Sequence, residues 1–160
     1  MADSAKYEPV LHIVLHQPEI PHNTGSVGRT CVAAGCKLWL VRPLGFRLDD
    51  YYLRRAGLDY WQHLEWEAVD DWAALLKRLA GPRWFFSKTG RTSYLDVRYQ
   101  MGDVLVFGSE SQGLPPSLLD DAGERLLRIP VRPQARCLNL SNAVGVVTFE
   151  ALRQMGLSQA

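Results

Sequence analysis

The amino-acid sequence predicts an α/β fold in which a mostly parallel sheet is flanked by helices. Short apolar, β-rich runs recur along the chain, and most are followed by a polar loop and then by a helical run. This alternation of strand and helix is typical of parallel sheets. The length of 160 residues suits one domain with a sizeable core, and the 47% apolar and 22% charged shares are ordinary for a globular protein.

The first part of the chain contains two β-rich runs separated by a helical one. A strand is expected over residues 10–16, V-L-H-I-V-L-H, and a second strand over residues 37–42. Between them, Asn23 or Thr24 is expected to cap a helix that ends at Gly35.

The middle of the chain is less regular. The run D-D-Y-Y-L-R-R-A-G is expected to form a short helix capped near Asp49, and the aromatic-rich residues 58–67 leave a short strand as an open possibility. Asp70 is expected to cap a clearly amphipathic helix that Gly81 and Pro82 stop.

The last part of the chain alternates again. A helix is predicted over residues 116–122, and another one, capped by Ser141 or Asn142, is predicted to run to about Met155. Three further strands are expected over residues 83–87, 103–108 and 126–129. Because ligands bind at the carboxyl ends of parallel strands, the chain at Ser87, Gly108 and Ile129 is the expected ligand edge.

The N-terminus and the cysteines bear on the compartment. Residues 1–8, M-A-D-S-A-K-Y-E, are polar, so we expect a flexible tail before a single domain over residues 9–160, with no signal peptide and no membrane span. Cys31, Cys36 and Cys137 have no zinc-like spacing. These features predict a cytoplasmic protein with reduced thiols, no metal site and no membrane partner.

The stretch from Ile129 to Val147 is unusually polar for a connection between a buried strand and a buried helix. It carries guanidinium groups beside small hydrogen-bonding side chains: Arg132, Arg136, Cys137, Asn139, Ser141 and Asn142. That set suits a small polar ligand next to a phosphate. The net charge is only +1, but 14 of the 18 basic residues are arginine, which reflects either phosphate binding or genome composition.

Two other polar loops fail the standard phosphate fingerprints. H-N-T-G-S-V-G-R, which ends at Arg29, is not G-x-G-x-x-G. G-S-E-S-Q-G-L-P has the glycine spacing of a phosphate loop, but Leu114 and Pro115 stand where Lys and Ser or Thr are required. Taken alone, Arg29 reads equally well as an exposed helix residue, and Glu110 reads better as an exposed loop acid.

Together and in this order, three motifs are far more specific. They are N-x-G-x-x-x-R, F-G-x-E-x-x-G-L-P and I-P-x-x-x-x-x-R-x-L-N-L-S-N-A-V. This set resembles the SPOUT class of RNA methyltransferases. The runs Q-P-E-I-P-H-N-T-G and L-R-R-A-G-L-D-Y-W are similar to the single-domain tRNA (cytidine/uridine-34 2′-O)-methyltransferase subfamily, and the resemblance covers about residues 10–157.

The resemblance implies a SPOUT fold with a C-terminal deep trefoil knot and S-adenosyl-L-methionine as methyl donor. Composition and periodicity do not suggest a knot, since knots are rare exceptions among protein folds. The residues implied to bind the donor are Ser87, Gly108, Ile129, Cys137 and Leu138. Cys137 departs from the serine that the family commonly has, which weakens a side-chain role at that position.

The resemblance also implies a set of catalytic residues: Arg29, Asn23, Glu110, Asn139 and Ser141. Arg29 is expected to act on the ribose or on its adjacent phosphate, with Asn23 holding Arg29 or the ribose. A neutral arginine as general base is unfavourable, because lowering its pKa from above roughly 12 to neutrality costs on the order of 7 kcal/mol. We therefore favour Arg29 as a phosphate anchor.

The implied partners are a tRNA anticodon stem-loop and a second copy of the chain. The C-terminal helix is the expected homodimer interface through Val144, Val147, Phe149 and Leu152, with an ordinary core helix as the alternative. Candidate RNA-binding groups are Arg42, Arg47, Arg54, Arg55, Arg132 and Arg136, with Tyr51, Tyr52 and Trp61 either stacking on bases or lying in the core.

Three other functions stay open at this point. One is methyl transfer to another tRNA or rRNA site, because target choice depends on surface residues whose arrangement the sequence does not give. Another is a non-catalytic RNA-binding protein of the same fold, against which the intact candidate residues argue. The third is an unrelated α/β enzyme that binds a nucleotide at the same strand ends.

Overall fold

The computed structural model describes residues 8–49, 55 and 60–157, and these form one parallel sheet with helices on both faces. The sheet has seven strands in the order β3-β2-β1-β6-β4-β7-β5, and every strand pair is parallel. The strands are β1 His12–His16, β2 Lys37–Val41, β3 Trp66–Val69, β4 Arg83–Phe86, β5 Thr92–Ser93, β6 Val104–Phe107 and β7 Leu126–Arg128. The predicted α/β fold class is confirmed.

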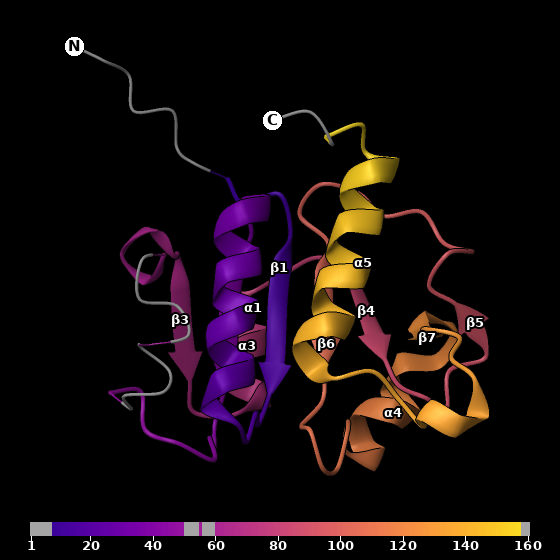
Figure 1. Cartoon of the computed structure of the whole chain (residues 1–160), viewed down its shortest axis with the longest axis horizontal. Helices are drawn as coiled ribbons and strands as arrows, with labels where there is room; N and C mark the ends of the chain where they lie inside the picture. Colours follow the sequence, from indigo (N-terminus) through magenta and orange to yellow (C-terminus); the bar gives the residue numbers. More distant parts are fainter. Residues whose placement is uncertain (1–7, 50–54, 56–59, 158–160) are drawn as a thin grey trace.

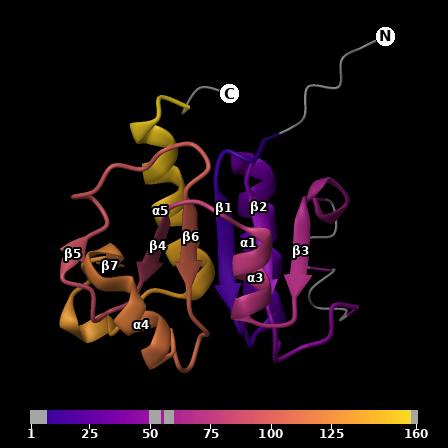
Figure 2. The same cartoon turned by 180° about the vertical axis from the view of Figure 1, so that it is seen from behind.

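Helices cover the two faces in pairs. α1 Pro21–Ala34 and α5 Leu140–Gln154 lie side by side on one face (Figure 1). α3 Trp72–Arg78 and α4 Pro116–Ala122 lie on the other (Figure 2). Three short 3₁₀ helices complete the described chain, namely η1 Trp61–His63, η2 Gly123–Arg125 and η3 Pro133–Ala135.

The core divides into two apolar layers, one on each face of the sheet. Val27, Val144 and Val147 of α1 and α5 lie in the first layer, and Leu75 and Leu118 of α3 and α4 lie in the second. β1, β2 and β6 are almost entirely buried. This explains their continuous apolar runs, since a parallel sheet is covered on both faces.

The start of α1 differs from the prediction. Ile20 is the N-cap residue and Pro21 is the first helical residue, so neither Asn23 nor Thr24 caps the helix. Proline suits this position because its fixed φ is helical and its missing N–H has no helical partner there. Asn23 therefore lies within the first turn, and its side chain is available for contacts with other loops. Gly35 ends the helix at φ 73°, as predicted.

Two other predicted caps are displaced along the chain. α5 is capped by Asn139, not by Ser141 or Asn142. α3 is capped by Asp71, whose carboxylate accepts a hydrogen bond from Ala74 N at 2.8 Å, and not by Asp70. In each case the sequence offers adjacent capping residues, and the chain direction at entry decides between them.

The middle segment is only partly described. Most of the helix expected from Asp49 onward lies outside the described residues, as do Tyr51, Tyr52 and Arg54. The open possibility of a strand near residues 58–67 corresponds to β3, which begins only at Trp66 and follows η1. β5 was not predicted, because two residues carry no recognisable periodicity.

α5 is mainly a core helix. Val144 and Val147 are fully buried in this chain and Leu152 nearly so, which contradicts their predicted place in a dimer interface. Phe149, in contrast, is 53% exposed. Within the described residues, no helix has both the length and the hydrophobicity needed to cross a bilayer.

Candidate active site

Four strand ends meet at one edge of the sheet. The order β1-β6-β4-β7 places the carboxyl ends of these strands in a row, because all of them run in the same direction. The connections that leave this row contain all three motifs found in the sequence. Residues more than 80 positions apart along the chain therefore become neighbours there.

Glu110, in the loop after β6, binds the start of α1. Its carboxylate accepts hydrogen bonds from the backbone N–H of Glu19 at 2.7 Å and of Ile20 at 3.1 Å, and from Asn23 Nδ2 at 3.2 Å. A carboxylate at a helix N-terminus also interacts favourably with the helix dipole. Glu110 is thus a fixed acceptor between two loops, and its interpretation as an exposed loop acid is wrong.

Asn23 and Asn139 extend this contact to the third loop. Asn23 is buried, and its Oδ1 accepts a hydrogen bond from Asn139 Nδ2 at 3.0 Å. Asn139 Oδ1 in turn accepts from the backbone N–H of Ser141 at 2.9 Å and of Asn142 at 3.3 Å, and from Ser141 Oγ at 2.6 Å. We call Glu110, Asn23, Asn139 and Ser141 the carboxyl-edge network.

The carboxyl-edge network unites four of the five predicted catalytic residues. Both oxygens of Glu110 and both polar atoms of Asn23 are engaged within the protein. Such a set orients the loops and caps α5.

Arg29, the fifth predicted catalytic residue, lies six positions beyond Asn23 on α1 and is exposed. Its guanidinium carbon lies 4.7 Å from the centre of the Tyr60 ring, and its Nη2 donates to the Tyr60 hydroxyl at 3.3 Å. Among the described residues, the Asn23 side chain bonds Glu110 and Asn139, so the expectation that Asn23 holds Arg29 is wrong. Tyr60 was missed, although it stands in the L-R-R-A-G-L-D-Y-W run.

Ser87 and Gly108 follow adjacent strands, β4 and β6. Ser87 N donates to Leu127 O at 2.9 Å, and the Ser87 hydroxyl is engaged by Thr89 in a tight turn. A Cβ on Gly108 would overlap the backbone of Gly113 and Leu114, which explains why only glycine fits there. The Ser87 carbonyl oxygen accepts from Gly90 N at 3.1 Å and, having a second lone pair, is the Ser87 backbone group that can still accept from a ligand.

The loop after β7 carries the other three predicted donor-binding residues. Ile129 and Leu138 are half-buried, and Cys137 is exposed. Arg136 adopts φ 60° and ψ −66°, closed by a hydrogen bond from Cys137 N to Ala135 O at 2.7 Å. This is the strained, positive-φ form of the γ-turn, and such strain is commonly found at functional sites.

These residues fit S-adenosyl-L-methionine chemically. Ser87, Gly108 and Ile129 follow the neighbouring strands β4, β6 and β7, so their backbone groups line one stretch of the edge. Ile129 and Leu138 add apolar surface of the kind that an adenine ring requires. Within the described residues, no group of His, Cys, Asp or Glu is arranged to hold a metal ion.

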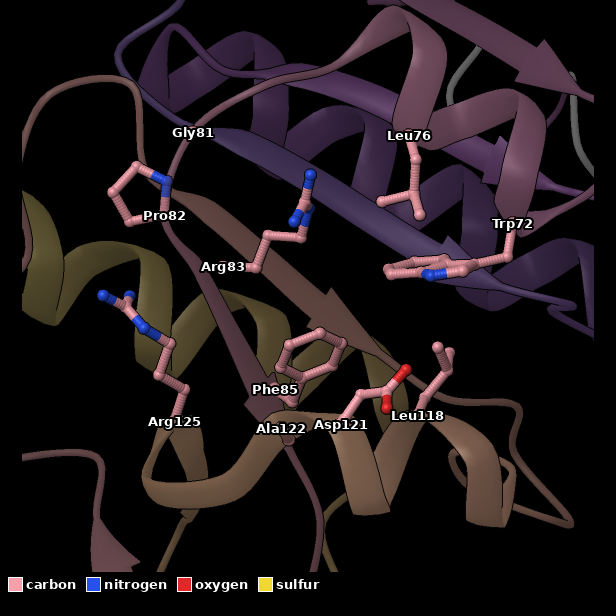
Figure 3. A pocket seen from close by; sticks show the side chains of 10 residues that line it. All are labelled: Trp72, Leu76, Gly81, Pro82, Arg83, Phe85, Leu118, Asp121, Ala122 and Arg125. Atoms are coloured by element: carbon pink, nitrogen blue, oxygen red, sulfur yellow. The ribbon is translucent and has the colours of Figure 1, made fainter.

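Two hollows are lined by other residues. One of about 350 Å³ lies between α3 and α4, with Phe85 on its floor, Trp72 at one side and Arg83, Asp121 and Arg125 around it (Figure 3). A second, of about 230 Å³, lies behind the Glu110 loop. It is lined in part by His16, whose pKa is lowered by burial. The predicted donor-binding residues are not among those that line either hollow.

An open parallel sheet with its polar network and glycine-dependent loops at the carboxyl edge defines an α/β enzyme that binds its ligand there. The chain belongs to the SpoU rRNA Methylase family, which it matches over residues 10–149. The resemblance to the SPOUT class of RNA methyltransferases is thereby confirmed, and the trefoil knot is implied by this membership.

Individual relatives are similar over almost the whole chain. A tRNA (cytidine(34)-2′-O)-methyltransferase of Saccharophagus degradans is 46% identical over 154 residues, which is 93% of this chain and 98% of the relative. A solved structure described as giving insights into the 2-OH methylation of C/U34 on tRNA superposes with a TM-score of 0.87 at 47% identity, covering 91% of this chain and 96% of that one.

A more distant structure is informative about the methyl donor. An AdoMet-bound rRNA methyltransferase of Sinorhizobium meliloti superposes with a TM-score of 0.80 at 28% identity, covering 92% of this chain and 61% of that protein. The fold of the present chain is therefore one that accepts this donor in a related enzyme.

Proposed function

We propose that this protein transfers a methyl group from S-adenosyl-L-methionine to the ribose 2′-hydroxyl of the wobble nucleotide, position 34, of tRNA. The observation that carries the proposal is the carboxyl-edge network, which brings residues of all three motifs together at the ligand edge. The similarity to tRNA (cytidine(34)-2′-O)-methyltransferases over nearly full length supports the choice of nucleotide. We also propose a cytoplasmic location, which fits a tRNA substrate.

The donor is held by the loops that follow β4, β6 and β7, through Ser87, Gly108, Ile129, Cys137 and Leu138. S-adenosyl-L-methionine supplies a methyl group on a sulfonium, which is already a good leaving centre. The Ser87 carbonyl and backbone groups at Gly108 recognise the adenosine, and Ile129 and Leu138 flank its ring. Cys137 in place of serine is compatible with this role, because the contact there is assigned to the backbone.

The residues of the protein then have to place the ribose and help its hydroxyl lose a proton. Arg29 binds the phosphate next to the ribose. The oxygen–carbon bond forms as the carbon–sulfur bond breaks, and the hydroxyl proton leaves through that phosphate to water. The carboxyl-edge network holds the donor-binding loops and the start of α1 in fixed positions relative to one another during this step.

RNA contacts are assigned to exposed arginines near the same edge. Arg132 and Arg136 are exposed in the loop that carries Cys137. Arg47 is paired with Asp49 at 3.2 Å, and its charge is partly neutralised. Trp61 is half-buried and packs against Trp66 at a ring separation of 5.3 Å, which supports a structural role for it.

We also propose a homodimer that uses the outer side of α5. Val146 is 39% and Phe149 53% exposed, and their spacing of three residues places them on one face of the helix. A Cβ on Gly145 would meet no atom within 4 Å, which leaves room for close approach by a second copy. Light scattering of the wild-type protein and of Phe149→Asp tests this assignment.

The decisive experiment is methyl transfer to unfractionated tRNA from a strain that lacks this gene. Purified protein is incubated with the tRNA and labelled S-adenosyl-L-methionine, and the labelled nucleotide is mapped. We expect label on the ribose of nucleotide 34. Label at another nucleotide would retain the methyltransferase and reject the assigned target, and absence of both label and donor binding would reject the activity.

A further inference from the structure

The segment just before β3 docks closely on α1 at Gly28. A Cβ added to Gly28 would lie 3.0 Å from Leu64 Cδ2 and 3.3 Å from Trp61 Cζ3, so these side chains rest on the helix backbone. Leu64 is buried, and Trp61 packs against Trp66. The segment from Tyr60 to Leu64 is thus fixed against α1 from two sides.

Tyr60 stands at the start of this segment and faces the residue that follows Gly28. The Tyr60 carbonyl accepts a hydrogen bond from His63 N at 2.9 Å, which ties its backbone to η1. The Tyr60 ring lies against the Arg29 guanidinium, and its hydroxyl accepts from Arg29 Nη2. Gly28, which allows this segment to pack closely on α1, directly precedes Arg29, which contacts Tyr60 of the same segment.

Arg29 and Tyr60 have further hydrogen-bond donors that can bind an anion. A guanidinium has five N–H donors, and Tyr60 engages one N–H and one face of it. Because the phenol oxygen accepts from Arg29, the phenol hydrogen is available for an external acceptor beside the guanidinium. An RNA phosphate supplies acceptor oxygens with the spacing that two adjacent donors require.

We propose that Tyr60 is a positioning residue, which holds Arg29 in the orientation that binds the substrate phosphate and donates its own hydroxyl hydrogen to the same phosphate. This inference rests on the proposed function and assigns a second residue to its phosphate contact. Holding the arginine in advance reduces the side-chain entropy lost when RNA binds.

A second exposed arginine–aromatic pair provides a matched control. The Arg125 guanidinium carbon lies 4.9 Å from the centre of the Trp84 ring, and Arg125 lines the hollow on the opposite face of the sheet (Figure 3). Its geometry is close to that of Arg29 and Tyr60, but it is remote from the ligand edge. Arg125→Ala therefore measures the effect of losing such a pair outside the site.

The test compares Tyr60→Phe, Tyr60→Leu, Arg29→Ala, Arg125→Ala and the Arg29→Ala/Tyr60→Leu double variant in steady-state methylation of tRNA. Tyr60→Phe, which keeps the ring and loses the hydroxyl, is expected to lower kcat/KM by about tenfold. Tyr60→Leu is expected to lower it further. The loss in the double variant is expected to be smaller than the product of the two single losses, because the two residues act on one phosphate together.

Two further readouts separate positioning from general stability. Donor affinity by calorimetry and the melting temperature are expected to match the wild type for both Tyr60 variants, and Arg125→Ala is expected to be unchanged in every assay. Wild-type kcat/KM in Tyr60→Leu, additive losses in the double variant, or a loss of donor affinity equal to the loss of activity would each overturn the inference.

If the proposed function is wrong, a binding measurement can still test the role of Tyr60. If the wild-type protein transfers no methyl group to tRNA, binding of an anticodon stem-loop RNA at several salt concentrations decides the inference independently. Arg29→Ala should then reduce the salt dependence by about one phosphate contact, and Tyr60→Leu should weaken binding more strongly when Arg29 is present than when it is absent. Equal weakening by Tyr60→Leu with and without Arg29 would overturn it.

Discussion

The carboxyl-edge network and the Arg29–Tyr60 pair are both parts of the candidate site, but they are built differently. In the network, Glu110, Asn23 and Asn139 join loops about 90 to 116 residues apart and direct their polar atoms at one another. In the pair, an exposed cation makes one hydrogen bond at 3.3 Å and one ring contact. This contrast supports the proposal that the network organises the site and that the Arg29–Tyr60 pair contacts the substrate.

The largest effect is expected from removing the centre of the network. Glu110→Ala leaves the N–H groups of Glu19 and Ile20 and the Asn23 amide without their acceptor. We expect a loss of about 3 kcal/mol in the free energy of unfolding, from hydrogen bonds to a charged group, together with weaker donor binding. Denaturant titration and calorimetry measure these changes. Glu124→Ala, at an exposed acid, is the control, and equal stability of the two variants would contradict an organising role for Glu110.

At the Arg29–Tyr60 pair we expect a large loss of activity and little loss of stability. Arg29→Ala should lower kcat/KM by about 100-fold, which corresponds to about 2.7 kcal/mol of transition-state stabilisation, because the phosphate contact is lost. The free energy of unfolding should change by less than about 0.5 kcal/mol, since Arg29 is exposed. Methyl-transfer kinetics and denaturant titration on one protein preparation give both numbers. Full activity of Arg29→Ala would remove this residue from the mechanism.

A smaller loss of stability is expected at the end of the network. Asn139→Ala removes the cap of α5 and the bond to Asn23, for about 1–2 kcal/mol of unfolding free energy. Asn139→Asp keeps the capping acceptor but sets a carboxylate oxygen against Asn23 Oδ1, so it should recover only part of the difference. Asn142→Ala is the matched control, because Asn142 contributes its backbone N–H, which alanine retains. If thermal unfolding gave Asn139→Ala and Asn142→Ala the same stability, the cap would not contribute to the stability of the fold.

The smallest expected effect is a decrease in the stability of the fold at mildly acidic pH. Burial lowers the pKa of His16, which lies at the end of β1 behind the Glu110 loop. The folded protein therefore binds this proton less readily than the unfolded chain, so stability is complete above the unfolded pKa of about 6.5 and falls as pH decreases through that range. Stability measured between pH 7.5 and 5.5 should show this slope, and His16→Gln should reduce it. His12, whose pKa is lowered by burial and by the Lys37 charge, contributes in the same direction and limits the reduction. An unchanged slope in His16→Gln would contradict the assignment.

Much of the fold could be predicted from the sequence because its strands and helices correspond to local patterns of apolar and turn-forming residues. Five of the seven strands are apolar runs in continuous sequence, and Gly35 ends α1 where predicted. The contacts that make the site are not local. Nothing near Glu110 in the sequence indicates that its acceptors face Glu19 and Ile20, some 90 residues earlier.

The errors at the helix starts have the same physical origin. Asn23 resembles a cap because a short amide side chain can serve either a helix terminus or a distant loop, and the sequence does not distinguish the two uses. In the folded protein it bonds Glu110 and Asn139, and Pro21 begins the helix instead. Four of the five catalytic residues that the resemblance implies are thus joined by hydrogen bonds, but only the structure shows which atoms bond.

The common direction of the seven strands also matters for handling the protein. All loops assigned to ligands leave one edge, so the turns at the opposite edge are available for chemical attachment. The turn before β6 is one example, since Met101 is 58% exposed and Gly102, at φ 83°, is tied to Val10 through its backbone. A dye or surface linker at position 101 would report on RNA capture while leaving the ligand-binding edge unobstructed.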